Sequence, residues 1–189
     1  MRNLKTQFKN KTSGFTLVEL IVSLGLFTIV VMIAMGAMLS LSDTNRKVKT
    51  MRIAMDNLNM ALDSMSREIR MGSVYTCNPS LPVTLSYGDV GADCVNGASS
   101  LAFFSQDGDT MVYRLNGTTI QRSKNGGSSG SFSDMTAADI TIDELVFYVR
   151  GAGSGVEQPR VIISLSGTVN DKVSSSFRLQ TTATQKLAK

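Results

Sequence analysis

Residues 15–41 form an apolar run, FTLVELIVSLGLFTIVVMIAMGAMLSL, in which Glu19 is the only charged residue. As an α-helix this run would be about 40 Å long, enough to cross the roughly 30 Å hydrocarbon core of a bilayer. A helix that is apolar on all sides is buried in a membrane or among other helices rather than exposed to water. The run therefore predicts a transmembrane helix over residues 15–41.

The residues before this run are basic. Residues 1–14 contain Arg2, Lys5, Lys9 and Lys11 and no acidic residue, so they account for the net charge of +4. The rest of the chain carries 15 basic and 15 acidic residues, and this neutral body gives no reason to predict nucleic-acid binding. The basic segment is expected to stay in the cytoplasm, which places the C-terminal part on the other side of the cytoplasmic membrane.

A secretory signal peptide also begins with basic residues, but its apolar segment usually spans about 7–15 residues. The run in this chain is longer, so it favours an anchor that stays in the mature protein. Cleavage by signal peptidase near Ala34-Met35-Gly36, which would release a soluble protein, is an alternative that the length of the run disfavours.

Two residues at the start of the run are unusual for a simple anchor. Gly14 stands at its cytoplasmic border, where a cut would keep the anchor in the mature chain. Glu19 places a carboxylate inside the run, where a charge is costly and usually has a partner or a function. A cut after Gly14 would give Phe15 a free amine one helical turn from Glu19. That amine, in the same subunit or in a neighbour, is a candidate partner.

Residues 14–20, GFTLVEL, resemble the GFTLxEL signature of type IV prepilins and type II secretion pseudopilins. The resemblance implies that a prepilin peptidase cuts after Gly14 and N-methylates Phe15. It also implies that Glu19 sets the register of subunits during assembly. The implied partners are prepilin peptidase, other pilin or pseudopilin subunits and the cytoplasmic membrane. An ordinary single-span anchor with a tolerated Glu is the alternative.

Residues 42–72 are more polar but keep a helical pattern. Gly72 stands where a C-terminal cap is expected, so the anchor and this amphipathic continuation would form one helix of about 55 residues. The apolar stripe is interpreted as packing against a sheet of the same chain, with a coiled-coil seam as the alternative. Met residues at this spacing are more often core residues than copper ligands. The stripe consists of Val48, Met51, Met55, Leu58, Leu62, Met65 and Ile69.

Residues 73–189 are predicted to form an extracytoplasmic, β-rich globular domain. Residues 73–98 are expected to be a loop because they contain Pro, Gly and Asn-Gly turn signals. Consecutive strands with short turns give an antiparallel sheet whose one face the helix can cover, so the fold class is α+β, as in the pilin family. Strands are predicted at residues 101–105, 110–115, 118–122, 140–150, 160–166 and 176–182, with a hairpin turn at Asn116-Gly117.

Cys77 and Cys94 are the only cysteines. Both lie between the helical segment and the strands, in a part predicted to be outside the cytoplasm, where disulfides persist. A disulfide is the favoured interpretation, and two unpaired buried thiols are the alternative. Their separation does not fit a C-x-x-C redox or zinc motif.

No residue pattern indicates catalysis, a cofactor or a metal site. The sequence contains no His, and no P-loop, GxGxxG or nucleophile elbow. Asp107-Gly108-Asp109 could give two oxygens to calcium, but it lacks the other ligands of a loop motif and is interpreted as a turn. Asp143 and Glu144 are adjacent, so on a strand they would face opposite ways. The chain is therefore not expected to be an enzyme.

Residues 145–149, 158–163 and 176–183 resemble the C-terminal strands of J-type minor pseudopilins and related minor pilins. The early position of Cys77 and Cys94 departs from major pilins, which more often carry a disulfide-bounded loop near the C-terminus. The resemblance therefore implies a minor subunit of a type IV pilus or a type II secretion pseudopilus. The alternative hypothesis is a stand-alone, single-span membrane-anchored binding module.

Overall fold

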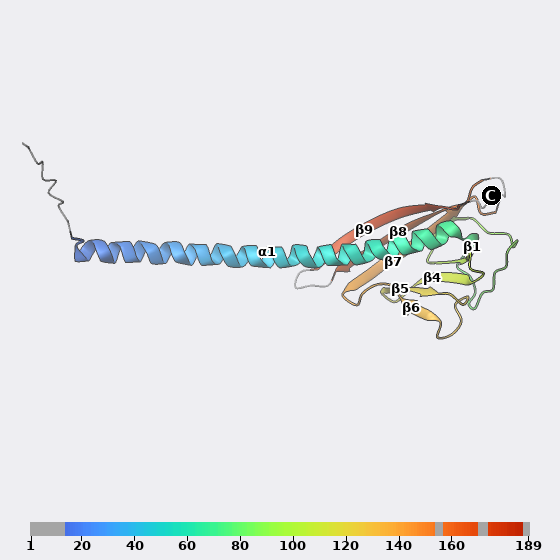
Figure 1. Cartoon of the computed structure of the whole chain (residues 1–189), viewed down its shortest axis with the longest axis horizontal. Helices are drawn as coiled ribbons and strands as arrows, with labels where there is room; N and C mark the ends of the chain where they lie inside the picture. The colour runs from blue at the N-terminus through green and yellow to red at the C-terminus, as the bar shows by residue number, and fades with distance from the viewer. Residues whose placement is uncertain (1–13, 154–156, 170–173, 187–189) are drawn as a thin grey trace, which may run out of the picture. The chain divides into compact units, whose positions relative to one another are not determined.

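The computed structural model of the chain describes residues 14–153, 157–169 and 174–186. The predicted basic leader, apart from Gly14, lies outside the described residues. The chain divides into two units, Met1–Arg46 and Lys47–Lys189. Figure 1 shows that the described part of the first unit is helical, whereas the second combines the rest of that helix with β-strands.

Helix α1 runs from Leu17 to Met71 and contains no proline. It begins directly after Thr16, a residue type that is preferred at helix N-caps. The single helix predicted from the apolar run and its amphipathic continuation is confirmed. It starts two residues after Phe15 and ends one residue before Gly72.

Donors from the β-rich part hold the C-terminal end of α1. The N–H of Gly72 donates to the carbonyl of Ile69 (3.0 Å), and the N–H of Lys186 donates to that of Arg70 (2.7 Å). The buried Tyr75 hydroxyl lies 2.7 Å from the Ile69 carbonyl and 2.8 Å from that of Gly72, so its proton is shared between them. These contacts satisfy carbonyls that a helix end leaves without intrahelical partners.

Gly72 follows the helix as predicted, but it is not the left-handed cap that usually explains a glycine at this position. Its φ lies outside the left-handed region. A Cβ atom at Gly72 would lie 2.4 Å from Cδ2 of Phe103 and 3.2 Å from the carbonyl oxygen of Phe104. Close packing against β3 (Ser100–Phe104) therefore requires the glycine.

Two antiparallel sheets form the β-rich part, with strand orders β1-β3-β4-β5-β6 and β2-β7-β8-β9. The predicted α+β class is confirmed, whereas the prediction of one sheet is wrong. Sequence periodicity marks strands but does not say which strands pair, so the division into two sheets was not visible. The strands are β1 (Ser73–Cys77), β2 (Cys94–Ala98), β3 (Ser100–Phe104), β4 (Thr110–Asn116), β5 (Thr119–Ser123), β6 (Phe132–Asp134), β7 (Ile140–Arg150), β8 (Arg160–Val169) and β9 (Ser175–Thr184).

The prediction of a loop over residues 73–98 is wrong at both ends, where β1 and β2 lie. The register of β1 shifts between Ser73 and Thr76, and Val74 within it has a φ of 55°. The register of β2 also shifts along its five residues. Short strands with bulges do not show the regular alternation that identifies a strand in a sequence.

The predicted hairpin between β4 and β5 is confirmed, but its turn lies one residue later than Asn116-Gly117. Asn116 ends β4 and pairs with Thr119, so Gly117 and Thr118 are the two turn residues. Gly117 has a φ of 60°, and Thr118 does not share this positive φ. Positive φ at the first central residue alone is typical of a type II′ turn, where glycine is preferred.

The apolar stripe of α1 packs into one core with residues of both sheets. The buried part of the stripe therefore packs within the chain and does not form a coiled-coil seam. Val48, at the start of the predicted stripe, is 62% exposed, so the prediction is wrong at that position. The buried residues of α1 are Ala54, Leu58, Ala61, Leu62, Met65 and Ile69.

Gly167 in β8 tests how tightly this core is packed. A Cβ atom there would lie 2.3 Å from the Thr141 carbonyl oxygen and 2.8 Å from Cζ of Phe177. We expect Gly167→Ala to lower the free energy of unfolding by about 1–3 kcal/mol, because overpacking displaces backbone or ring. Denaturant titration of the purified full-length chain in detergent would measure this change.

The matched control for Gly167 is Gly153→Ala. A Cβ atom at Gly153 would meet the Gly91 carbonyl oxygen at 3.5 Å, an ordinary contact. This variant should change the free energy of unfolding by less than about 0.5 kcal/mol. Equal losses in the two variants would contradict the packing argument.

Candidate processing and assembly site

Thr16 organises the N-terminal end of α1. Its Oγ1 accepts a hydrogen bond from the N–H of Glu19 (3.3 Å), and its carbonyl accepts one from the N–H of Leu20 (3.2 Å). Thr16 is thus the N-cap, and Glu19 occupies the third helical position, which is the Thr-x-x-Glu spacing of a capping box. A carboxylate in the first turn also interacts favourably with the positive end of the helix dipole. The Thr-x-x-Glu spacing is visible in the sequence, but the N-cap at Thr16 was not predicted from it.

Gly14 and Phe15, the predicted cleavage residues, directly precede the N-cap. Phe15 is 79% exposed, and a Cβ atom at Gly14 would meet no atom of the chain within 4 Å. The bond between them is therefore accessible to a peptidase. Glu19 follows Phe15 by four residues, about one helical turn. The structure thus places the three predicted residues near each other, and their roles in cleavage, methylation and register stay predictions.

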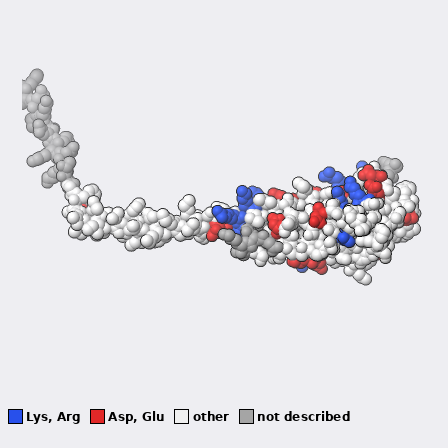
Figure 2. All heavy atoms as spheres, turned by 90° about the horizontal axis from the view of Figure 1, so that it is seen from below, with Lys and Arg blue, Asp and Glu red and all other residues white. Residues whose placement is uncertain are grey.

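Helix α1 is the one helix in the described residues that is long and apolar enough to cross a membrane. No residue of its most apolar 18-residue window is buried within the chain. Figure 2 shows that the visible face of this segment is almost free of charged side chains. Large apolar side chains such as Phe27 and Met32 are 65% and 74% exposed. Such a surface needs a membrane or neighbouring helices to cover it.

The N-terminal segment of the chain matches a known family model. Residues 9–35 match the family model described as the prokaryotic N-terminal methylation motif. The chain carries a prokaryotic N-terminal methylation motif. The motif covers Gly14, Phe15 and Glu19 and the first part of the apolar run, and it supports processing by a prepilin peptidase and anchoring in a membrane. No curated protein and no solved structure shows a significant match to the chain.

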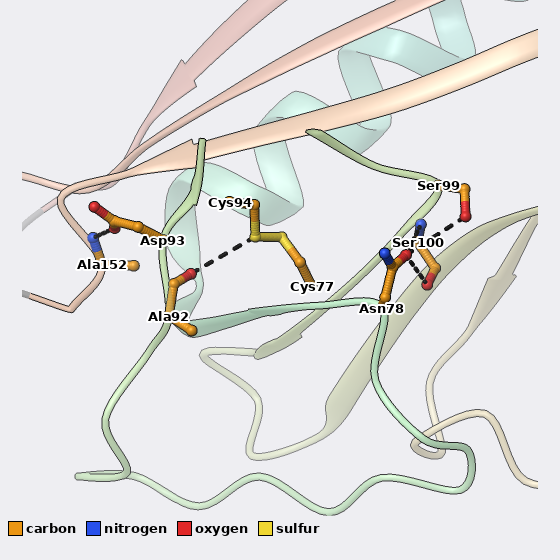
Figure 3. The surroundings of a disulfide bond; sticks show 8 residues. All are labelled: Cys77, Asn78, Ala92, Asp93, Cys94, Ser99, Ser100 and Ala152. Carbon is orange, nitrogen blue, oxygen red and sulfur yellow. Dashed lines mark hydrogen bonds between the residues drawn. A yellow bond between two sulfur atoms is a disulfide. The ribbon is translucent and has the colours of Figure 1, made fainter. Parts of the chain in front are cut away.

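Cys77 and Cys94 form a disulfide with their Cα atoms 6.3 Å apart. Cys77 ends β1 and Cys94 begins β2, so the bond joins edge strands of the two sheets. Figure 3 shows two further contacts beside it. Asn78 Oδ1 accepts from the N–H of Ser100 (3.3 Å), and Asp93 Oδ1 accepts from that of Ala152 (2.7 Å). The favoured interpretation of the two cysteines is confirmed, and both ends of the intervening loop are fixed.

Replacing both cysteines, by Cys77→Ser and Cys94→Ser, is expected to lower the free energy of unfolding by about 3 kcal/mol. The bond spans a sequence separation of 17, and a loop of that size loses roughly this much unfolded-state entropy when closed. Denaturant titration of the oxidised protein and the double variant would give the difference. Reduced wild-type protein is the control and should match the double variant. Non-reducing peptide mapping that finds both thiols free in envelope-derived protein would refute the bridge.

Glu68, Tyr113 and Arg122 join α1 to the five-stranded sheet, a contact that the sequence did not suggest. Arg122 Nη1 lies 2.7 Å from Glu68 Oε1, and the Tyr113 hydroxyl donates to Glu68 Oε2 at 2.5 Å. Burial raises the pKa of Tyr113, and the hydrogen bond to Glu68 raises it further. These residues match no motif and lie far apart along the chain, so the sequence does not predict their contact.

The buried phenols predict a loss of stability at high pH. Burial raises the pKa of both Tyr75 and Tyr113 above the ordinary value of 10.0. Only the unfolded chain can ionise these groups near that pH. The two tyrosines therefore contribute their full stabilisation of the folded chain below pH 10. Above pH 10 the free energy of unfolding falls, by up to about 1.4 kcal/mol per pH unit for each tyrosine. Tyr113→Phe should make the fall shallower between pH 10 and 11.5, whereas Tyr87→Phe, at an 88% exposed position, should not. Equal slopes in all three proteins would contradict this account.

The acidic residues that could bind a metal or a substrate do not form a cluster in the described parts of the chain. Asp107 and Asp109 lie in the turn between β3 and β4, and no group of three or more potential ligand residues occurs in the described parts of the chain. The strand alternation predicted at Asp143 and Glu144 does not hold, because a register shift interrupts β7 at this point. Both residues are consequently exposed.

Proposed function

We propose that the chain is a minor pilin or pseudopilin, a structural subunit without catalytic activity. A prepilin peptidase would cut after Gly14 and methylate Phe15, and the mature subunit would join a type IV pilus or type II secretion pseudopilus. The observation that carries this proposal is a methylation motif placed on a helix whose apolar surface the chain does not bury. Helices of neighbouring subunits would cover that surface, with Glu19 setting their register.

The proposed organisation is a leader at residues 1–14, an assembly helix at 15–41, its continuation at 42–72 and an extracytoplasmic domain at 73–189. Charge alone does not decide the orientation, because four basic residues precede the apolar run and four follow it closely, at Arg46, Lys47, Lys49 and Arg52. The disulfide supports an extracytoplasmic domain, because such bonds persist outside the reducing cytoplasm.

Two features of the β-rich part support a minor subunit, most similar to a J-type pseudopilin. The disulfide lies at the start of this part rather than near the C-terminus. Strands β7, β8 and β9 follow one another as antiparallel neighbours, in agreement with the three segments that carry the resemblance.

Mass spectrometry of the mature N-terminus tests the proposal. Protein from cells that contain the peptidase should begin at Phe15 and carry one additional methyl group. Protein from cells that lack it should keep Met1. A mature chain that begins near residue 37 would contradict the proposal and indicate release by signal peptidase.

An unprocessed Met1 in peptidase-containing cells would instead favour the membrane-anchored binding module. One feature of the β-rich part would suit that function. A groove of about 1190 Å³ lies between the start of β1, residues 87–91 and Lys186. Tyr87 and Val90 at this groove are 88% and 80% exposed, which is typical of surfaces that contact other molecules.

A further inference from the structure

The two sheets have four edge strands, and three of them are poor templates for another strand. β1 and β2 are short and bulged, and the disulfide joins them to each other. β6 has only three residues. Bulges and short length are the means by which proteins prevent unwanted pairing at sheet edges.

The fourth edge strand, β9, has none of these protections. It contains ten residues and no proline, and Arg178 is its only charge. All ten residues pair with β8 without a register shift. Figure 1 shows β9 at the margin of its sheet. A long, regular and nearly uncharged edge is a ready template for strand addition.

Two hydrogen bonds show which groups of β9 face away from β8. The N–H of Gln185 donates to the Pro159 carbonyl (2.9 Å), so odd-numbered residues are hydrogen-bonded to β8. The N–H of Lys186 donates away from β8, to the carbonyl of Arg70 (2.7 Å). In an antiparallel ladder these directions alternate along the strand. The even-numbered residues of β9 therefore present their N–H and C=O groups at the open edge.

The outward row consists of Ser176, Arg178, Gln180, Thr182 and Thr184. Within the described residues no backbone group pairs with this row, since β9 is the last strand of its sheet. The same five side chains are exposed, whereas Leu179 and Thr181 between them are half-buried at the margin of the core. A further strand would satisfy the row and cover these two side chains. The chemistry of the edge thus fits an extended polypeptide.

We propose that the open edge of β9 receives an extended strand from a different subunit of the same assembly. The proposal rests on the proposed function, because it takes the partner from the filament. Main-chain hydrogen bonds would supply most of the contact, as in other cases of strand addition. A nearly neutral strand fits best, with an acidic side chain opposite Arg178 as the one charge preference.

Geometry excludes a second copy paired through the same edge in a closed dimer. β9 runs in the direction of the second part of α1, because Ser175 lies beside Met51 and Met55 while Lys186 bonds to Arg70. An antiparallel β9 pair would therefore set the second parts of the two α1 helices in opposite directions, whereas subunits of the proposed filament would run in the same direction. In a parallel pair related by a two-fold axis, each residue of β9 would lie opposite the same residue of the other copy. Parallel strands bond only when a residue that points its N–H and C=O toward the partner lies opposite a residue that points them away, so this pair could not form its hydrogen bonds.

Photo-crosslinking in the native host tests the proposal with the full-length chain. A photoreactive amino acid in place of Thr182 should crosslink to another protein that carries an N-terminal methylation motif. The same amino acid in place of Ser133, an exposed residue of β6, is the matched control and should give at least about tenfold less of that product, because β6 offers no regular edge.

Proline at Gln180 tests the hydrogen-bonded edge directly. Gln180→Pro removes an outward N–H while leaving every bond to β8, as edge strands allow. It should lower the crosslink from position 182 at least about tenfold, because one bond is lost and the ring obstructs the added strand. Gln180→Ala keeps the N–H and should retain the crosslink. Thr182→Lys, combined with a photoreactive amino acid in place of Thr184, is a second blocking variant. An intact Cys77–Cys94 disulfide and unchanged protease resistance would show that the variants fold.

Three results would overturn the proposal: a crosslink to a second copy, a crosslink that survives Gln180→Pro in folded protein, or no crosslink in assembled filaments. The mature N-terminus is measured in the same samples. A chain that still begins at Met1 contradicts the proposed function, whereas methylated Phe15 without a crosslink contradicts only the strand addition.

Discussion

Gly14→Val is expected to lower conversion of the full-length chain to its mature form by about a hundredfold or more. A peptidase that cuts after Gly14 must hold the scissile bond in a confined site, and a displacement of about 1 Å can cost on the order of 10²-fold in rate. Pulse-labelling in cells that carry the peptidase would follow the shift from precursor to mature protein.

The structure makes this substitution a test of the peptidase rather than of folding. A Cβ atom at Gly14 meets no atom of the chain within 4 Å, and its φ is not in the left-handed region. Valine therefore fits the chain itself without strain. Gly25 in α1 has the same open surroundings, so Gly25→Val is a matched control and should be processed normally. Gly14→Ala should be processed to an intermediate extent.

Processing of Gly14→Val at the wild-type rate would show that the cut lies elsewhere. Loss of processing in both Gly14→Val and Gly25→Val would instead point to a general defect in membrane insertion. The total amount of the protein in the membrane fraction, precursor plus mature form, separates these results, because the valine at Gly14 should leave this total unchanged.

The N-terminal half of the molecule could be predicted because its signals are local. The apolar run, the proline-free stripe and the GFTLVEL motif all lie along one helix or directly before it, and α1 begins and ends within two residues of the expected bounds. The processing motif is also a continuous segment, residues 9–35. Periodicity and motif spacing report such local features well.

The second half depends on contacts between residues far apart in the sequence. β2 pairs with β7 and β1 pairs with β3, and neither pairing can be read from alternation within a strand. Arg122 and Glu68 are 54 residues apart. The strain at Val74 and the bulge in β7 also arise from tertiary packing that overrides local preference. Strand β7, predicted at residues 140–150, and strand β4, predicted one residue short at 110–115, were predicted best.

Glu19→Ala is expected to leave membrane insertion and cleavage intact and to reduce incorporation into the filament by roughly tenfold or more. In an assembled filament the carboxylate would be buried with a positive partner, and removal of one member of a buried pair leaves the other charge uncompensated. Cleavage supplies that partner as the Phe15 amine, most simply on an adjacent subunit, because assembly packs these helices side by side. Insertion should become easier, because a charge in the apolar run is costly.

The contact between Thr16 and Glu19 adds an alternative cause that the experiment must separate. Glu19 also occupies the capping-box position of α1, so Glu19→Ala could weaken the start of the helix as well as remove the charge. Glu19→Gln keeps a side chain that suits this position but carries no charge. Thr16→Ala removes the side-chain oxygen of the cap and keeps the charge. If charge sets the register, both Glu19 variants should fail to assemble, and processed Thr16→Ala should assemble.

The measured quantity should be recovery with other filament subunits divided by the total amount of processed protein in the membrane. This ratio separates assembly from insertion and cleavage, which the substitution is expected to spare. Assembly of Glu19→Gln at the wild-type ratio, with failure of Thr16→Ala, would assign the residue to helix capping and refute its role in register. Poor insertion of Glu19→Ala with normal assembly of the inserted fraction would contradict the ion-pair account altogether, since a lone carboxylate in the apolar run can only hinder entry into the membrane.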